Sequence, residues 1–272
     1  MYSPITHELL YTHGMNDTNL DQIVSAVRAG GEVVKRYFGE LLQTEEKSSA
    51  GDLRTKADIE SEQAIVSALR RAFPAYNVYA EESGQLDNKS EYTFVIDPLD
   101  GTNNFVLGIP DFAVSIGLLH GDEAVLGVIY NPILDRLYTA QKGQGAYLNG
   151  KQIHVNTETD IAKATVSYTC GYNTSRDYSD NITRKLHDLP VKRVLDTWAP
   201  AYDYCLLASG RLEAVISKEG DLEDYVAAKI IVTEAGGKIS DFKNQPVNGR
   251  AADFVATNGT AIHGQLVALL YT

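Results

Sequence analysis

Apolar residues recur every three or four positions in the first quarter of the chain, as they do along one face of an α-helix. The first such run predicts an amphipathic helix, whose inward positions are Leu20, Ile23, Val24, Val27, Val34 and Phe38. A second run predicts a helix over 55–73, which Pro74 ends because proline cannot continue a helix. Residues 1 to about 18 lack this pattern and are predicted to form a loose leader.

Shorter apolar stretches in the middle of the chain have the length of β-strands. The predicted strands cover 77–80, 92–96, 113–119, 124–130 and 137–140. Short connections such as 120–123 favour antiparallel pairing, because parallel strands need longer crossovers. Together with the two helices, these strands predict an antiparallel-rich α+β N-terminal lobe over 19–150.

After Gly150 strands and helices alternate, which is typical of α/β proteins. Strands are predicted near 165–168, 192–195, 212–217 and 254–257, and helices near 180–186, 201–209, 225–235 and the C-terminus. We therefore expect a C-terminal α/β lobe over 151–272.

Composition narrows the classes of function. The formal net charge is −12, whereas proteins that bind nucleic acids or anionic membranes need an excess of Lys and Arg, so neither partner is expected. The chain has no signal-peptide pattern and no apolar run as long as a transmembrane helix. Cys170 and Cys205 form no CxxC motif, which argues against a disulfide framework or a thiolate zinc site and favours the reducing cytoplasm.

The segment Asp97-Pro98-Leu99-Asp100-Gly101-Thr102 follows a predicted strand and combines two carboxylates with a proline and a glycine. The proline keeps Asp97 extended and starts a tight turn, so Asp100 is expected to curl back toward Asp97. Two carboxylates about 4 Å apart repel by about 4 kcal/mol at an effective dielectric constant of ~20, and we infer that a cation lies between them. A solvated β-turn is the alternative interpretation.

Three further acidic features argue against a simple turn. They are Glu81-Glu82 after a predicted strand, Asp58 early in a predicted helix and the segment 221–224 at the start of another helix. Acidic residues also favour helix N-termini for electrostatic reasons, so each feature is weak alone. Carboxylates without paired histidines are ligands for Mg²⁺, Mn²⁺ or Ca²⁺ and not for zinc or copper. The histidines are not expected to bind a metal. Four of them are predicted to be turn or surface residues: His120, His154, His187 and His263.

The segment 101–104, Gly-Thr-Asn-Asn, is predicted to begin a helical turn whose free backbone N–H groups could hold phosphate oxygens. Two competing motifs fail. The segment 145–151 has Walker-like spacing, but Gln152 replaces the metal-binding Ser or Thr, and Asn149-Gly150 predicts a hairpin. The chain has no G-x-S-x-G nucleophile elbow, so serine hydrolase chemistry has no support.

In their order along the chain, these motifs resemble the signatures of the inositol monophosphatase family of Mg²⁺-dependent, lithium-sensitive phosphatases. The resemblance runs from about Leu20 to the C-terminus. It rests on Lys47-Ser48-Ser49 with Asp52, Thr55 and Asp58, on Glu81-Glu82-Ser83, on 97–102, on Gly143-x-Gly145-Ala146-x-x-Asn149-Gly150, and on Asp224 ten residues before Glu234-Ala235-Gly236-Gly237.

This resemblance implies the layered αβαβα sugar-phosphatase fold, in which the C-terminal lobe completes the active site, and it implies a role for each motif. The implied metal ligands are Glu81, Asp97, the Leu99 carbonyl, Asp100 and Asp224, with the first two on one ion and the three aspartates on a second. Thr102 and Asp58 are implied to orient and deprotonate a water that attacks phosphorus in line, with Glu81 as a third catalytic residue. The implied substrate contacts are Gly101, Thr102, Asn103 and Asp224.

The implied cofactor is Mg²⁺, with two or three ions per active site, Mn²⁺ as a substitute and Ca²⁺ or Li⁺ as inhibitors. The implied partners are a small phosphorylated substrate and a second copy of the chain in a homodimer. The leading substrate is myo-inositol 1-phosphate, and the alternatives are fructose 1,6-bisphosphate, 3'-phosphoadenosine 5'-phosphate and histidinol phosphate. A catalytically silent regulatory protein that keeps the fold is the alternative of another class.

Four positions depart from the family pattern and bear on the substrate. The tryptophan that usually precedes the third aspartate is Glu223, and the glycine five residues after that aspartate is Lys229. Lys218 stands where a hydroxyl-accepting carboxylate is usual, and it would suit a second anionic group unless Glu219 compensates. Trp198 lies in the segment that usually forms the other pocket wall, where it would either stack on a ring of the substrate or belong to the core.

Overall fold

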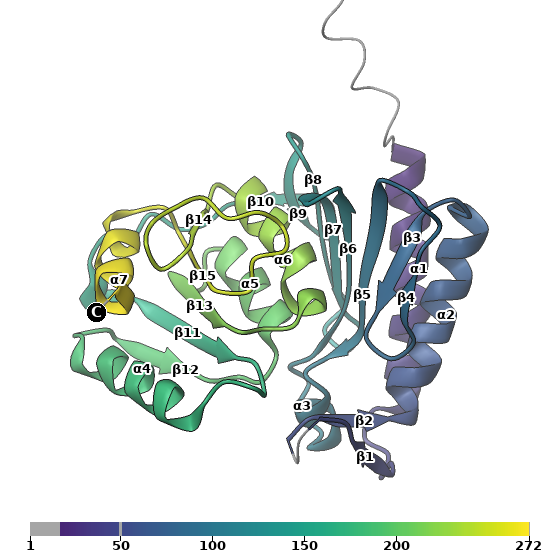
Figure 1. Ribbon diagram of the computed structural model, residues 1–272, viewed down its shortest axis with the longest axis horizontal. Coiled ribbons are helices and arrows are strands. Elements are labelled where there is room, and N and C mark those ends of the chain that lie inside the picture. The colour runs from purple at the N-terminus through teal and green to yellow at the C-terminus, as the bar shows by residue number, and fades with distance from the viewer. Residues whose placement is uncertain (1–16, 49–50, 272) are drawn as a thin grey trace, which may run out of the picture.

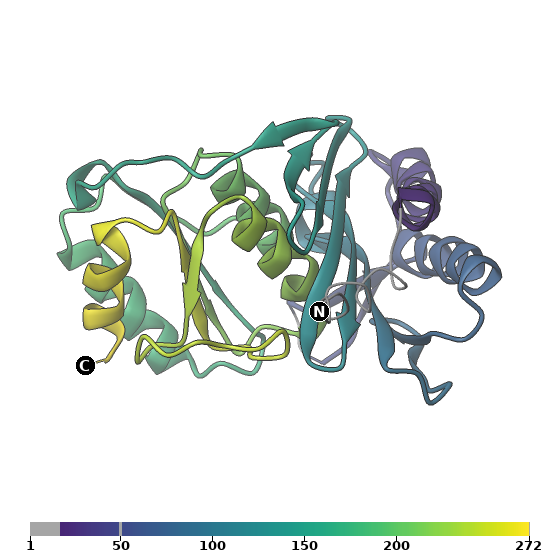
Figure 2. The same ribbon diagram turned by 90° about the horizontal axis from the view of Figure 1, so that it is seen from above.

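The computed structural model describes residues 17–48 and 51–271, in which helices and sheets alternate in five layers (Figures 1 and 2). The first layer holds α1 (Asp17–Tyr37) and α2 (Lys56–Ala72), which cover one face of an eight-stranded sheet. The other face carries α5 (Pro200–Ala208) and α6 (Leu222–Glu234). A five-stranded sheet follows, and α4 (Arg176–Asp188) and α7 (Ala261–Tyr271) cover its outer face. The expected αβαβα layering is confirmed, while the predicted leader lies outside the described residues up to residue 16.

The eight-stranded sheet has the order β10-β9-β8-β7-β6-β5-β3-β4. Its strands are β3 (Asn77–Ala80), β4 (Gly84–Leu86), β5 (Tyr92–Asp100), β6 (Ala113–His120), β7 (Glu123–Asn131), β8 (Arg136–Gln141), β9 (Gly145–Leu148) and β10 (Lys151–Ile153). From β5 to β10 each neighbouring pair is antiparallel, which confirms the expected pairing and the hairpin at Asn149-Gly150. Only β3 and β5 pair in parallel within this sheet, as far as the described residues extend.

The end of β5 differs from the prediction. We expected a strand that stops at Ile96 and a tight turn at Pro98, whereas β5 continues to Asp100. The register of β5 against β6 shifts between Asp97 and Asp100, so the segment is an irregularity within the pairing and not a turn. The physical reason is that proline has no N–H for the neighbouring strand and is tolerated at such bulges.

The five-stranded sheet has the order β12-β11-β13-β15-β14. Its strands are β11 (Thr165–Cys170), β12 (Arg193–Leu195), β13 (Ala214–Lys218), β14 (Lys238–Ser240) and β15 (Phe254–Thr257). β11 pairs in parallel with β12 and β13, and β15 pairs antiparallel with β13 and β14. The strands that the sequence did not predict are β4, β14 and the hairpin of β1 (Thr44–Glu46) and β2 (Leu53–Thr55). Each has three residues, too few to display a period.

Helix α6 packs closely on the eight-stranded sheet because a glycine leaves room for it. A Cβ atom on Gly117 would lie only 2.5 Å from Cγ1 of Val226, so a larger residue would push the helix away. Val226, Ala227 and Ala228 are buried in the core between the two sheets. The close approach brings the first turn of α6 to the end of β5, where both elements carry carboxylates.

His263 lies in the interior and not at the surface as predicted. It is 1% exposed, and its ring nitrogens lie 2.9 Å from Oγ of Ser240 and 3.0 Å from Oγ1 of Thr257. Burial lowers the pKa of His263 to about 4, so the ring is neutral at physiological pH. The two hydroxyl partners belong to other elements, which local sequence does not reveal.

None of the helices within the described residues is both long enough and apolar enough to cross a bilayer.

Candidate active site

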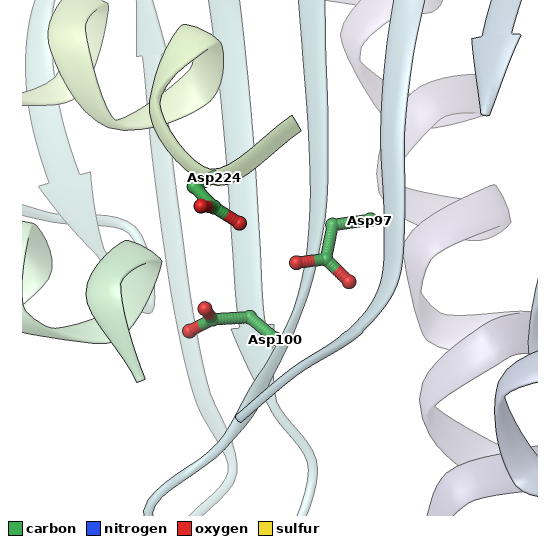
Figure 3. Close-up of side chains that lie close together, drawn as sticks. All are labelled: Asp97, Asp100 and Asp224. Atoms are coloured by element: carbon green, nitrogen blue, oxygen red, sulfur yellow. The ribbon is translucent and has the colours of Figure 1, made fainter. Parts of the chain in front are cut away.

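Three aspartates converge between the end of β5 and the start of α6 (Figure 3). Carboxylate oxygens of Asp97, Asp100 and Asp224 lie within 4.8 Å of one another. As predicted, Asp100 approaches Asp97, and α6 brings Asp224 to them from the C-terminal part of the chain. The bulge in β5 makes this possible, because in a regular strand residues three apart point to opposite faces.

Backbone contacts hold the bulge in place. The N–H of Leu99 donates a hydrogen bond to Oδ1 of Asp97 (2.8 Å), which fixes that carboxylate against its own strand. Ser61 on α2 donates from Oγ to the carbonyl of Pro98 (2.9 Å) and is itself fully buried. The irregular segment is therefore anchored from the helical layer behind it.

The carboxylates of the other two aspartates accept hydrogen bonds at helix N-termini. Oδ2 of Asp100 accepts a hydrogen bond from the N–H of Tyr202 in the first turn of α5 (3.2 Å). Asp224 is the third residue of α6, and its Oδ2 accepts from the N–H of Asp221 (3.2 Å) in a capping box. The partial positive charge of both N-termini offsets part of the repulsion between the carboxylates.

The electrostatics of this group call for a cation. Burial raises the pKa of Asp97, Asp100 and Asp224 well above the usual value, and neighbouring carboxylates raise it further. Within the described part of the chain, no Lys or Arg forms a salt bridge with any of the three. Donors that are all oxygen suit hard divalent cations such as Mg²⁺ and Mn²⁺, so the residues present fit a divalent metal.

Glu81, the other predicted carboxylate ligand, lies beside this group and is not one of the three converging residues. Its carboxylate bonds Nζ of Lys47, which also bonds Oε1 of Glu82 (3.0 Å). Burial raises the pKa of Glu81 to about 7, while Lys47 acts to lower it. The family motif included Lys47, but sequence reasoning did not assign it a role. In the structure Lys47 forms salt bridges with both glutamates that follow β3.

Thr102 and Asp58 form the predicted pair. Oγ1 of Thr102 lies 2.9 Å from Oδ1 of Asp58 and 3.0 Å from the carbonyl oxygen of Leu99. Oδ2 of Asp58 accepts from both the N–H (2.8 Å) and the hydroxyl (2.6 Å) of Thr55, because the two residues form the capping box of α2. Burial raises the pKa of Asp58, although these hydrogen bonds oppose the rise. The pair therefore joins the start of α2 to the end of β5.

The predicted helical turn at 101–104 exists as α3 (Thr102–Val106). Gly101 precedes it with φ of 86°, and a Cβ atom there would lie 3.1 Å from the carbonyl oxygen of Asp111, so the position requires glycine. Nδ2 of Asn103 donates to the carbonyl of Gly51 (2.8 Å) and lies 3.4 Å from the hydroxyl of Tyr172. Asn103 thus links α3 to two surface segments.

Lys218 does not offer a free positive charge. Its Nζ lies 2.8 Å from Oδ2 of Asp253 and 2.9 Å from Oε1 of Glu219, and its side chain is 16% exposed. The N–H of Glu219 also donates to Asp253 (2.9 Å). These two carboxylates neutralise Lys218, which weakens the argument for a second anionic group on the substrate.

Trp198 is not part of the core. It is 56% exposed and has a φ of 55°, a left-handed conformation that costs a residue other than glycine about 1–2 kcal/mol. Its neighbour Thr197 accepts a hydrogen bond at its carbonyl from Nδ2 of Asn104 on α3 (2.5 Å). Tyr172, 51% exposed, reaches the same helix through Asn103, and no sequence signal had pointed to it. Two exposed aromatic residues therefore adjoin α3.

The two departures on α6 are both buried. Lys229 donates from Nζ to the carbonyls of Asn248 (3.1 Å) and Ala251, and it lies over the ring of Phe254. It therefore ties α6 to the loop before β15. Glu223 is 7% exposed and adjoins Asp224.

Comparison with known proteins gives a consistent result. The model of the inositol monophosphatase family matches residues 15–272. Inositol monophosphatase 2 of Solanum lycopersicum is 36% identical over 247 residues, 88% of this chain and 93% of that protein. A fructose-1,6-bisphosphatase/inositol-1-monophosphatase of Aquifex aeolicus is 37% identical over 215 residues, 78% of this chain and 81% of that protein.

The fold has solved relatives as well. The extragenic suppressor protein suhB of Bartonella henselae superposes with a TM-score of 0.87 at 30% identity and covers 93% of this chain and 98% of its own. The family model and the structural superposition both cover nearly the whole length of this chain. The chain therefore belongs to the inositol monophosphatase family, and with it to the phosphoric monoester hydrolases.

Proposed function

We propose that the protein hydrolyses a small phosphate monoester in a Mg²⁺-dependent reaction, with myo-inositol 1-phosphate as the substrate. The single observation that carries the proposal is the convergence of Asp97, Asp100 and Asp224 next to the hydrogen-bonded pair of Thr102 and Asp58. Oxygen ligands for divalent cations and a group that can receive a proton from water thus lie around the end of β5. Metal-assisted hydrolysis requires this combination.

The residues that would hold the ions are Glu81, Asp97, the Leu99 carbonyl, Asp100 and Asp224. When bound, Mg²⁺ would make a coordinated water acidic and stabilise the negative charge on the leaving oxygen. In this proposal Oγ1 of Thr102 accepts a proton from the attacking water while it donates its own to Oδ1 of Asp58. The N–H groups of Gly101 and Thr102 bind phosphate oxygens, so positioning and electrostatics account for most of the rate.

Removal of divalent metal tests the reaction class. Protein treated with EDTA and dialysed is expected to release no phosphate from myo-inositol 1-phosphate, and added Mg²⁺ is expected to restore release. Colorimetric phosphate measurements across inositol 1-phosphate, fructose 1,6-bisphosphate, 3'-phosphoadenosine 5'-phosphate and histidinol phosphate would rank the substrates. Full activity in EDTA would contradict the metal requirement, and no release from any compound with Mg²⁺ present would favour the catalytically silent alternative.

Fructose 1,6-bisphosphate is the second candidate. The observation that favours it is that relatives from Aquifex aeolicus and Thermotoga maritima, 37% and 30% identical, are both named fructose-1,6-bisphosphatase/inositol-1-monophosphatase. The pairing of Lys218 with Asp253 and Glu219 speaks against a dedicated site for a second phosphate at that lysine. The same substrate panel separates the two candidates.

We further propose that Trp198 contacts the leaving group. Trp198→Gly is expected to raise the free energy of unfolding by about 1 kcal/mol, because glycine adopts the left-handed conformation freely. It is also expected to raise KM more than it lowers kcat, since the exposed indole is lost. Trp198→Ala is the matched control, because it removes the indole but keeps the backbone strain. Denaturant unfolding and steady-state kinetics of both variants measure the effects, and an unchanged KM in both would exclude Trp198 from the substrate site.

A homodimer is proposed on family resemblance alone. Light scattering on the purified protein would measure the oligomeric state.

A further inference from the structure

Glu223 is a buried carboxylate in which one oxygen atom has no hydrogen-bond partner in the described part of the chain. It is the second residue of α6 and is 7% exposed, and its Oε2 atom is fully covered with no hydrogen-bond partner among the described residues. Nor does Glu223 take part in any salt bridge within 17–48 and 51–271. A buried charged group is strongly unfavourable unless a cation or hydrogen-bond donors compensate it.

The charge of Glu223 acts on several groups of the acidic site. Its charge contributes to the raised pKa of Asp224, Asp97 and Glu81, which lie on α6, on β5 and after β3 respectively. It is also the largest cause of the raised pKa of Tyr79 on β3. The charge of Glu223 therefore raises the pKa of residues on more than one element. Three of these residues, Asp224, Asp97 and Glu81, are predicted metal ligands.

The nearby cations are already engaged by other groups. Lys47 bonds Glu81 and Glu82, and the charge of Lys47 reaches Glu223 only at longer range. Lys229 lies on the same helix, but its ammonium group donates to backbone carbonyls of the loop 248–251. The protein therefore supplies Glu223 with no counter-ion of its own in the described structure, whereas a divalent cation held by the adjoining aspartates would be one.

We propose that Glu223 is a part of the metal centre, where its carboxylate increases the affinity of Asp97, Asp100 and Asp224 for divalent cations. The inference rests on the proposed metal dependence and adds a residue to it. Attraction between a carboxylate and a divalent ion at this level of burial is large enough to change affinity by a factor of about ten or more. Glu223 acts here on metal binding and needs no contact with the substrate.

Metal titration of the whole protein tests this directly. Isothermal titration of EDTA-stripped protein with Mg²⁺ and with Mn²⁺, at mildly alkaline pH, is expected to give a Kd about tenfold or more weaker for Glu223→Gln than for the wild type. Glu213→Gln is the matched control. Glu213 is a buried glutamate, 9% exposed, that bonds Asn156 (2.8 Å) and the N–H of Thr165 (2.6 Å) away from the aspartates. Its removal is expected to leave the Kd unchanged.

Thermal unfolding gives a second readout that does not depend on catalysis. Without metal, Glu223→Gln is expected to have a higher Tm than the wild type, because one charge leaves a repulsive group. Its gain in Tm on addition of Mg²⁺ is expected to be smaller. Glu223→Met, which also removes the unpaired polar atom, replaces the glutamine variant if that variant does not fold.

The outcomes separate the inference from the proposed function. If the wild type binds no divalent cation, the proposed metal dependence fails. If the wild type binds Mg²⁺ and both Glu223 variants bind it within a factor of about two of the wild type, the role of Glu223 is overturned while the metal site stands.

Discussion

Asp97→Asn is expected to reduce kcat/KM for phosphate release by about a thousandfold, equivalent to about 4 kcal/mol of lost transition-state stabilisation. Asp97 is one of the three converging carboxylates, is 3% exposed and has its Oδ1 held by the N–H of Leu99. Asparagine keeps the shape and that hydrogen bond, but it offers a neutral oxygen in place of a charged ligand. Because the protein contributes mainly positioning and electrostatics in this chemistry, loss of one shared ligand charge has a large effect.

Two measurements separate a loss of chemistry from a loss of fold. In metal-free buffer the Tm of Asp97→Asn is expected to exceed that of the wild type, since burial and neighbouring carboxylates penalise the charge of Asp97. Asp87→Asn is the control, because Asp87 is an exposed aspartate that pairs with Lys89 (2.6 Å). It is expected to leave both activity and Tm nearly unchanged. Asp97→Asn with wild-type activity would remove the metal centre from the reaction.

The part of the fold that the sequence predicted is the part that local pattern determines. The helical spacing of apolar residues predicted α1 and α2, and the short polar connections predicted antiparallel pairing of the strands from β5 to β10. The proximity of Asp97 and Asp100 followed from their close spacing around a proline. The predicted tight turn between these two aspartates was wrong, because the structure has a bulge there. A bulge and a tight turn require similar residues, and only the pairing with β6 distinguishes them.

Contacts between distant segments were beyond prediction from pattern alone. Asp224 joins the site because Gly117 admits α6 to the sheet, and local sequence does not show which helix will fill that space. The neutralisation of Lys218 depends on Asp253, which precedes β15 while Lys218 ends β13. Trp198 is exposed and adopts a backbone conformation that a residue with a side chain disfavours. Tertiary packing overrides local preference at each of these positions.

Thr102→Ala is expected to lower kcat by about a hundredfold or more while Mg²⁺ affinity and Tm change little. The hydroxyl of Thr102 is the only atom of its side chain that bonds Asp58 (2.9 Å), and removing it breaks the route by which a proton would leave the attacking water. Thr102 is only partly buried, so its loss creates no large cavity. Thr102→Ser keeps the hydroxyl and is expected to retain most of the activity.

Asp58→Asn provides the contrast, because Asp58 has two roles that Thr102 does not share. Its Oδ1 faces Thr102, while its Oδ2 completes the capping box of α2 with Thr55. The Asp58→Asn variant would therefore lower kcat as Thr102→Ala does and also reduce the free energy of unfolding by about 1 kcal/mol through the weakened cap. Steady-state kinetics, Mg²⁺ titration and denaturant unfolding of the three variants resolve these effects. If Thr102→Ala retained wild-type kcat, the proton would leave by another route, and the pair would be an anchor between α2 and β5 only.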